Sequence, residues 1–136
     1  LVPLGQAEIK KEGTDVTLIS YSLMLNKTLG VAEQLAADGI NAEVIDLRTL
    51  SPLDRDTLAR SVQKTHKAVV IQEAVEVGGV AAQVVKSLVD SSFEYLDAPI
   101  KTVAACNTVI PFSPPLEDAM LPNEEKILAA AKEVLG

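Results

Sequence analysis

Short apolar runs alternate with longer amphipathic segments along this chain. Four largely apolar runs predict strands that are covered on both faces of a sheet: Val16–Tyr21, Ala42–Leu47, Ala68–Ile71 and Ile100–Ala104. Segments with apolar residues at helical spacing predict four helices: after Ser22 to about Asp38, Arg55 to about Lys64, after Gly79 to about Asp90, and Glu124–Leu135. This pattern is typical of repeated strand–helix units.

Residues at the junctions predict where these helices begin and end. Ser22, Asp54 and Asn123 each stand just before a predicted helix, where a side-chain oxygen can accept a hydrogen bond from a free backbone N–H. Gly39 follows the first predicted helix, at the usual place of a left-handed C-terminal cap. The segment Ala105–Asn123 holds four prolines and predicts a long loop without a regular element.

The order of these elements predicts the fold class. It is β-α-β-α-β-α-β-loop-α, preceded by the short charged segment Ala7–Glu12 as a candidate edge strand. Such alternation predicts a three-layer α/β fold, with a mostly parallel sheet, helices on both faces and right-handed crossovers. A length of 136 residues fits a single domain.

Composition and charge limit the classes of partner. The formal net charge of −7 disfavours nucleic acid and anionic membranes, which need a basic footprint, and is compatible with a basic protein. A single cysteine, no apolar run near the roughly 20 residues of a membrane span, and no signal-peptide pattern lead us to expect a soluble intracellular protein. The chain opens on Leu1 without an initiator Met, which fits a fragment of a longer chain and equally a mature chain.

Ligands of open α/β sheets bind beyond the carboxyl ends of the strands, where Arg48 and Glu73 stand in this chain. We expect these two side chains to face each other, either as an anion clamp and general base or as a structural or interfacial ion pair. The ion pair is favoured because no nucleophile and no set of metal ligands accompanies them.

The pair Gly78-Gly79 precedes a predicted helix and could present N–H groups to a phosphate. It lacks the spacing of a dinucleotide-binding motif and the lysine of a P-loop, and nearby glutamates repel phosphate. Close packing of the helix on a neighbouring surface is therefore the favoured interpretation. His66 lies in a polar turn and Cys106 has no second ligand nearby, so we expect no catalytic, cofactor-binding or metal-binding residue.

Five stretches together resemble one known family. They are VPLGQAEIKKEGTDVTLISY (Val2–Tyr21), AEVIDLRTLSPLD (Ala42–Asp54), VVIQEAVEVGG (Val69–Gly79), YLDAPIKTV (Tyr95–Val103) and IPFSPPLEDAMLPNEEKI (Ile110–Ile127). In this order they resemble the C-terminal domain of the β subunit of thiamin-diphosphate-dependent 2-oxo acid dehydrogenases, over essentially the whole chain. Gln72 departs from the pattern, since many relatives have histidine there.

The resemblance implies a transketolase C-terminal-type fold, with a sheet of about five strands and one antiparallel edge strand, here Ala7–Lys11. It implies that the complete enzyme decarboxylates a 2-oxo acid, with pyruvate favoured, and acylates a lipoyl group. Thiamin diphosphate and magnesium would bind outside this domain, so the isolated domain is expected to be inactive. The compartment would be the cytoplasm in a bacterium or the mitochondrial matrix in a eukaryote.

The resemblance also implies protein partners. They are an α subunit, a second β subunit in a homodimer contact, and the basic subunit-binding domain of the acyltransferase component. Arg48, Glu73, Gly78 and Gly79 are then expected at an interface instead of a catalytic centre.

Several alternatives stay open at this point. One is a free-standing nucleotide- or anion-binding α/β domain. Others are the equivalent domain of a branched-chain 2-oxo acid or acetoin dehydrogenase, and that of a transketolase or deoxyxylulose-phosphate synthase, which fits the LEDAMLP tail poorly.

Overall fold

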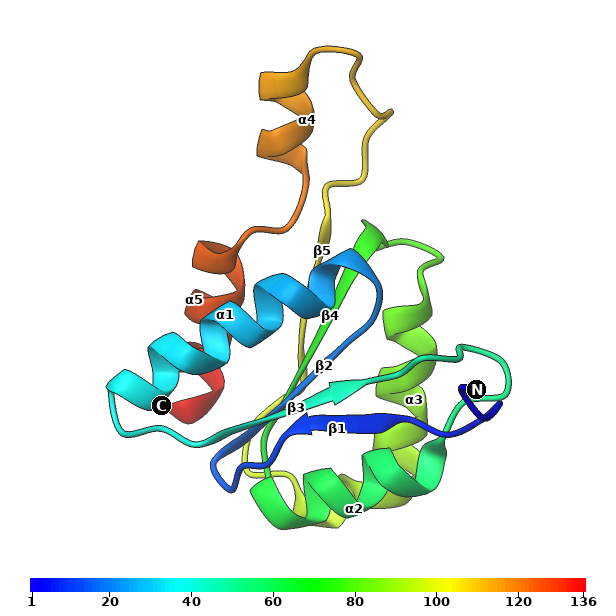
Figure 1. The fold of residues 1–136 in the computed structure, drawn as a ribbon, viewed down its shortest axis with the longest axis vertical. Coiled ribbons are helices and arrows are strands. Elements are labelled where there is room, and N and C mark those ends of the chain that lie inside the picture. Colours follow the sequence, from blue (N-terminus) through cyan, green and yellow to red (C-terminus); the bar gives the residue numbers. More distant parts are fainter.

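A five-stranded sheet runs through the centre of the computed structural model, which describes residues 1–136 (Figure 1). The strands are β1 (Glu8–Lys11), β2 (Val16–Ser20), β3 (Ala42–Asp46), β4 (Ala68–Val75) and β5 (Lys101–Ala105). Their order in the sheet is β1-β3-β2-β4-β5; β1 is antiparallel to β3, and the other neighbours are parallel. The predicted mostly parallel sheet and its antiparallel edge strand are confirmed.

Helices cover both faces of this sheet. They are α1 (Leu23–Ala37), α2 (Arg55–Thr65), α3 (Val80–Ser92), the 3-10 turn η1 (Phe93–Tyr95), α4 (Pro114–Met120) and α5 (Glu124–Leu135). Helices α1 and α5 share one hydrophobic core with the sheet, and α2 and α3 share a second core on the other face. The inner strands are buried on both faces, which explains why their sequences are continuous apolar runs. The predicted three-layer α/β class is confirmed.

Two of the three predicted N-terminal caps are confirmed. Asp54 accepts a hydrogen bond from the Thr57 N–H at 3.0 Å, and Asn123 accepts one from the Lys126 N–H at 2.9 Å. The expected cap at Ser22 is wrong, because this residue has a φ of 55° and its side chain makes no cap hydrogen bond. Gly39 has a φ of 79°, as expected for a left-handed C-terminal cap.

The segment Ala105–Asn123 departs from the prediction of a loop without a regular element. It contains α4, whose first two residues are Pro114 and Pro115. Proline is tolerated in the first turn of a helix, because the N–H groups there have no partner within the helix and the ring already holds a helical φ. Residues 106–123, called the arm from here on, project from the carboxyl edge of the sheet (Figure 1).

Strand β4 also runs further than the apolar run Ala68–Ile71 predicts. The ladder between β4 and β5 shifts register after Ile71 and resumes where Val75 lies beside Ala105. Gln72 lies in the shifted stretch, is buried, and donates a hydrogen bond from Nε2 to the Val75 carbonyl at 3.0 Å. Strand β4 thus continues past Gln72 toward the arm.

Candidate interaction surface at the carboxyl edge

The structure separates two residues that we expected to form an ion pair. Arg48, just beyond β3, pairs with Glu8 of β1 and not with Glu73, so the expected pair is wrong. The antiparallel register places Glu8 beside Asp46, two residues before Arg48. The hydrogen bond from Lys10, with the Arg48 charge adding to it, holds the pKa of the Glu8 carboxyl below its usual value. Arg48 thus helps to fasten the edge strand.

Gly79 is explained by close packing within the chain. A Cβ at this position would lie 2.2 Å from Nε2 and 2.7 Å from Oε1 of Gln72, so only glycine fits without a shift. The Gln72 Oε1 also accepts the Ala81 N–H at 2.8 Å, which occupies one free donor at the start of α3. Gly78 has a φ of 77°, a conformation that favours glycine. The glycine pair therefore fits the packing interpretation better than a phosphate site.

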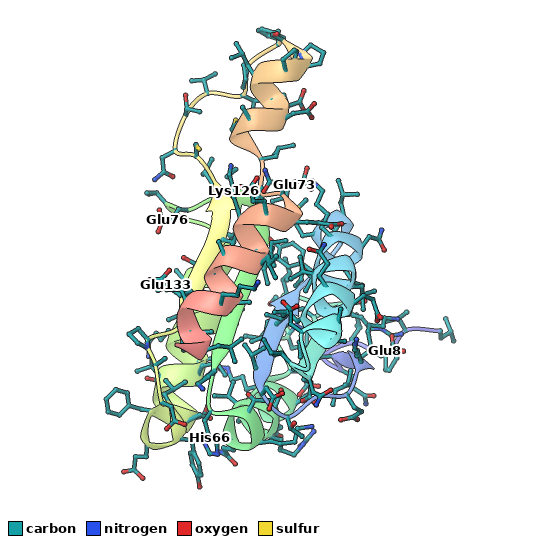
Figure 2. All side chains as sticks on the ribbon, turned by 90° about the vertical axis from the view of Figure 1, so that its left-hand side faces the viewer. Glu8, His66, Glu73, Glu76, Lys126 and Glu133 are labelled. Atoms are coloured by element: carbon teal, nitrogen blue, oxygen red, sulfur yellow. The ribbon has the colours of Figure 1, made fainter.

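Glu73 is exposed at the base of the arm, together with Glu76, whereas His66 lies at the opposite end of the sheet (Figure 2). The side chain of Tyr21 is half-buried near Glu73. Its burial, and then the charge of Glu73, raise the pKa of the Tyr21 hydroxyl above its usual value. The Glu73 carboxylate at the end of β4 therefore lies close enough to act on the Tyr21 hydroxyl beyond β2.

A hollow of about 400 Å³ opens between the arm and these strand ends. We call it the edge hollow; it is lined by Tyr21, Ser22, Glu73, Ala74, Val75, Ile110, Glu117, Met120 and Leu121. Most of these residues are apolar, and the charged ones are two carboxylates. The sequence did not reveal this feature, because it brings together the ends of β2 and β4 with the arm.

The arm exposes apolar side chains that the domain itself does not cover. They are Val109, Ile110, Phe112 and Leu116, and Phe112 is fully exposed. Met120 and Pro122 are the arm residues that are buried against the domain, and the Cys106 N–H donates to the Met120 carbonyl at 3.2 Å. The prolines of this segment led to the prediction of a loop, so the helix was missed. The apolar residues clustered in a predicted loop could have indicated a contact surface.

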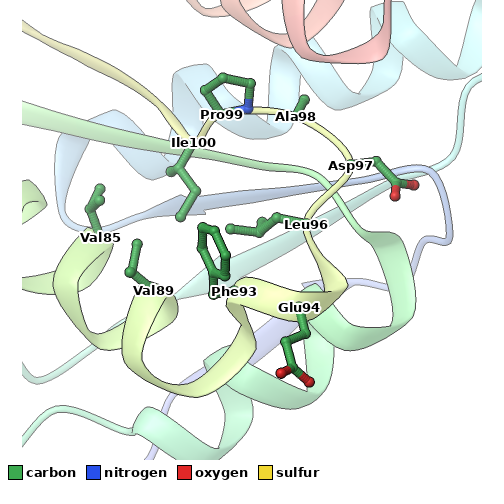
Figure 3. Close-up of a pocket in the computed structure, with 9 residues that line it drawn as sticks. All are labelled: Val85, Val89, Phe93, Glu94, Leu96, Asp97, Ala98, Pro99 and Ile100. Atoms are coloured by element: carbon green, nitrogen blue, oxygen red, sulfur yellow. The ribbon is translucent and has the colours of Figure 1, made fainter.

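A second hollow, of about 600 Å³, lies between the end of α3 and the residues before β5 (Figure 3). Its lining is mostly apolar and includes Val89, Phe93 and Ile100, with the carboxylates of Glu94 and Asp97 at the rim. No nucleophile or cation lines it. It is a second apolar surface at the other end of the sheet.

Neither His66 nor Cys106, the two residues set aside as unreactive, lines either hollow. His66 has a left-handed φ of 64° at the end of α2, and its Nδ1 lies 2.7 Å from the Tyr95 carbonyl oxygen. Cys106 is an exposed free thiol. No three His, Cys, Asp or Glu residues lie together as metal ligands, and none of the helices is long and apolar enough to cross a membrane.

Fold and sequence define the class of this protein. Residues 5–127 match the family model described as "Transketolase, C-terminal domain", and the chain belongs to this family. Its fold superimposes with a TM-score of 0.86 on the chain titled "Split gene transketolase, inactive beta4 tetramer", at 28% identity, covering 98% of this chain and 42% of that one.

More specific relatives agree with the resemblance in the sequence. The chain is 48% identical over 134 residues to the "Pyruvate dehydrogenase E1 component subunit beta" of Bacillus subtilis (strain 168), covering 98% of this chain and 41% of that protein. It is 45% identical over 135 residues to the "Acetoin:2,6-dichlorophenolindophenol oxidoreductase subunit beta" of the same organism, covering 99% of this chain and 40% of that protein. The chain thus spans about two fifths of these relatives, and the resemblance to this group of β subunits is confirmed.

Proposed function

We propose that this chain is the C-terminal domain of the β subunit of a 2-oxo acid dehydrogenase, with pyruvate as the favoured substrate of the complete enzyme. The 48% identity to a pyruvate dehydrogenase β subunit extends over nearly the whole chain and supports this assignment. The complete enzyme decarboxylates the 2-oxo acid and acylates a lipoyl group, and this domain supplies contact surface. By analogy with its bacterial relatives, it acts in the cytoplasm.

The exposed arm is the observation that carries the interface role. Val109, Ile110, Phe112 and Leu116 lie within eight residues of one another and are all largely exposed. Monomeric proteins rarely leave such apolar patches in water, and a partner that covers them gains hydrophobic free energy. In this role Glu73 lies in the edge hollow, and Gly78 and Gly79 shape the neighbouring loop. Arg48 fastens the edge strand β1 through its ion pair with Glu8.

The carboxyl edge does not fit thiamin diphosphate. The edge hollow presents Glu73 and Glu117 and no cation, so it repels a diphosphate. Gln72 already bonds the N–H of Ala81 at the start of α3. We therefore expect calorimetry to detect no binding of thiamin diphosphate with magnesium to the isolated domain, and no turnover of pyruvate. Saturable cofactor binding by the domain alone would overturn this assignment in favour of a free-standing ligand-binding domain.

The partners that follow from this function are an α subunit, a second β subunit and the acyltransferase component. The formal net charge of −7 supports a basic subunit-binding domain as the part of the acyltransferase that docks here. This charge complementarity predicts that docking weakens as salt concentration rises, because exposed ion pairs are screened.

An exchange of domains tests the assignment directly. The matching residues of the Bacillus subtilis pyruvate dehydrogenase β subunit are replaced by this chain, and the hybrid is produced with the α subunit of that enzyme. We expect an assembled enzyme by light scattering, with pyruvate-dependent reduction of a dye. A hybrid that folds by circular dichroism and yet fails to assemble would contradict the proposal.

The 45% identity to the acetoin oxidoreductase β subunit favours a second candidate function within the same class. The same exchange in that scaffold discriminates between the two. Higher activity of the acetoin hybrid than of the pyruvate hybrid, each measured relative to its own natural enzyme, would favour the acetoin assignment.

A further inference from the structure

The edge hollow combines an apolar wall with carboxylates that have no cationic partner. Val75, Ile110, Met120 and Leu121 supply most of the wall. Glu73 and Glu117 also line the hollow, and neither forms an ion pair within the domain. A volume of about 400 Å³ lies in the range of small-ligand pockets and exceeds that of one long side chain.

The charge around this hollow is negative beyond its lining. Glu76 and Asp118 are adjacent in sequence to the lining segments, are exposed, and also have no ion-pair partner. Two lysines bond to backbone carbonyls of the arm. Lys126 donates to the carbonyls of Ala119 and Leu121, both at 3.2 Å, and Lys27 donates to the carbonyl of Pro122 at 3.0 Å.

These observations specify the chemistry of an occupant. An aliphatic stem can pack on the apolar wall, while a cationic tip reaches the carboxylates at the mouth. Lysine and arginine side chains have this division, and arginine also stacks well on an aromatic ring such as that of Tyr21. Burial of Tyr21, and then the charge of Glu73, raise the pKa of its hydroxyl, so Tyr21 lies within reach of the Glu73 carboxylate.

We propose that the edge hollow binds a lysine or arginine side chain of another polypeptide, whose flanking apolar residues pack on the exposed face of the arm. The proposal deepens the interface function given above and rests on it, because the arm is the surface that carries that function. Phosphate-bearing and acidic ligands are excluded as occupants, since Glu73 and Glu117 repel them.

A short peptide serves as the probe. Acetyl-Leu-Arg-Leu-amide carries one cation between two apolar side chains, and the citrulline peptide of the same shape is its neutral match. We titrate each peptide, at millimolar concentration, into the 136-residue chain and follow the backbone amides by NMR. With the arginine peptide, we expect shift changes at Tyr21, Ala74, Val75 and Met120, and a Kd about fivefold lower than with the citrulline peptide.

Charge-removing variants test whether the peptide binds to the carboxylates of the edge hollow or only to the overall negative charge of the domain. The double variant Glu73→Gln/Glu117→Gln raises the Kd of the arginine peptide about fivefold. Glu94→Gln also removes a negative charge, but Glu94 lies at the rim of the hollow in Figure 3, so this variant leaves the Kd unchanged. Unchanged far-UV circular dichroism of each variant establishes that the fold is intact.

Three results would each overturn the proposal: equal binding of both peptides, no shift change with the arginine peptide, or changes confined to the hollow of Figure 3. The peptide experiment uses no partner subunit. Its failure therefore removes the proposed occupant and leaves the domain assignment standing, whereas failure of the domain exchange removes the assignment itself.

Discussion

The two edges of the sheet use their charged residues in different ways. At the amino edge, the carboxylate of Glu43 on β3 is fully buried and pairs with Lys64 of α2. At the carboxyl edge, Glu73 and Glu117 are exposed and unpaired beside an uncovered apolar arm. Glu43 thus holds elements of the domain together at one edge, whereas Glu73 and Glu117 are free to meet a partner at the other.

The amino edge is closed by short contacts among buried groups. The Gly13 N–H donates to Glu43 at 3.3 Å, and the Thr17 hydroxyl lies 2.7 Å from the hydroxyls of both Ser61 and Thr65. Burial alone would raise the pKa of the Glu43 carboxyl, but the hydrogen bond from Lys64 and its other bonds hold the pKa below the usual value. A desolvated carboxylate that keeps its charge needs this partner, which makes the amino edge sensitive to substitution.

The largest effect is expected from Gly13→Ala. The added Cβ would lie 2.3 Å from both the Ala42 carbonyl carbon and the Glu43 nitrogen, and backbone cannot move aside cheaply. We expect the free energy of unfolding, measured in urea, to fall by about 3 kcal/mol. Gly39→Ala is the control, since its Cβ meets nothing within 4 Å and only the positive φ costs about 1 kcal/mol. Equal losses in the two variants would contradict the close approach at Gly13.

Removal of the Lys64 cation is expected to have the next largest effect on the free energy of unfolding. Lys64→Met leaves the buried Glu43 carboxylate without its partner, and we expect a loss of about 2 kcal/mol, reduced because water reaches the lysine. Lys86→Met breaks an exposed pair with Asp90 and should change stability by less than about 0.5 kcal/mol. If Glu43→Leu/Lys64→Met is as unstable as the single lysine variant, the penalty does not come from the stranded charge.

Lowering the pH should reduce the loss of stability that Lys64→Met causes. Because the folded-state pKa of Glu43 lies below its ordinary value of 4.5, its contribution is present above this pH and is lost as the pH falls through the folded-state pKa. The cost of Lys64→Met measured by urea unfolding should therefore shrink as the pH is lowered from neutral to below 4.5. A cost that is constant over this range would mean that Glu43 is not the group that Lys64 compensates.

A substitution on the arm at the carboxyl edge should have the smallest effect on the stability of the isolated chain. Phe112 is fully exposed, so Phe112→Ser should change the free energy of unfolding by less than about 0.5 kcal/mol. In the hybrid enzyme, by contrast, the same change should weaken assembly, measured by light scattering. Ile9→Ser on β1 removes a partly exposed apolar side chain away from the arm and is the control. A hybrid that assembles equally well with Phe112→Ser would remove the arm from the interface.

Local signals were enough to predict most of the fold. The cap at Asp54 and the bounds of α5 follow from residues within one or two turns of each other, and the buried strands from continuous apolar runs. Helix α4 was missed because its seven residues are too few to establish an apolar period, and because its two prolines favour a loop on local grounds.

The contacts of the candidate site were harder to predict. Arg48 pairs with a residue 40 positions away, and this pairing depends on the antiparallel register of β1 beside β3. The edge hollow likewise requires the ends of β2 and β4 to meet the arm, which no short window of sequence records. Arg48 was correctly placed beyond β3, but Glu73 lies within the longer β4, and the two residues do not pair.

The order of strands and helices, the α/β class and the family can be predicted from the sequence, because apolar period, caps and motif residues are properties of neighbouring positions. Which charges are satisfied depends on the folded arrangement. Glu43 became a buried structural anion because Lys64 reaches it, whereas Glu73 and Glu117 stayed free because the arm projects from the domain and brings no cation into the hollow. Electrostatic and hydrophobic roles of this kind depend on distance and burial, which only the folded chain defines.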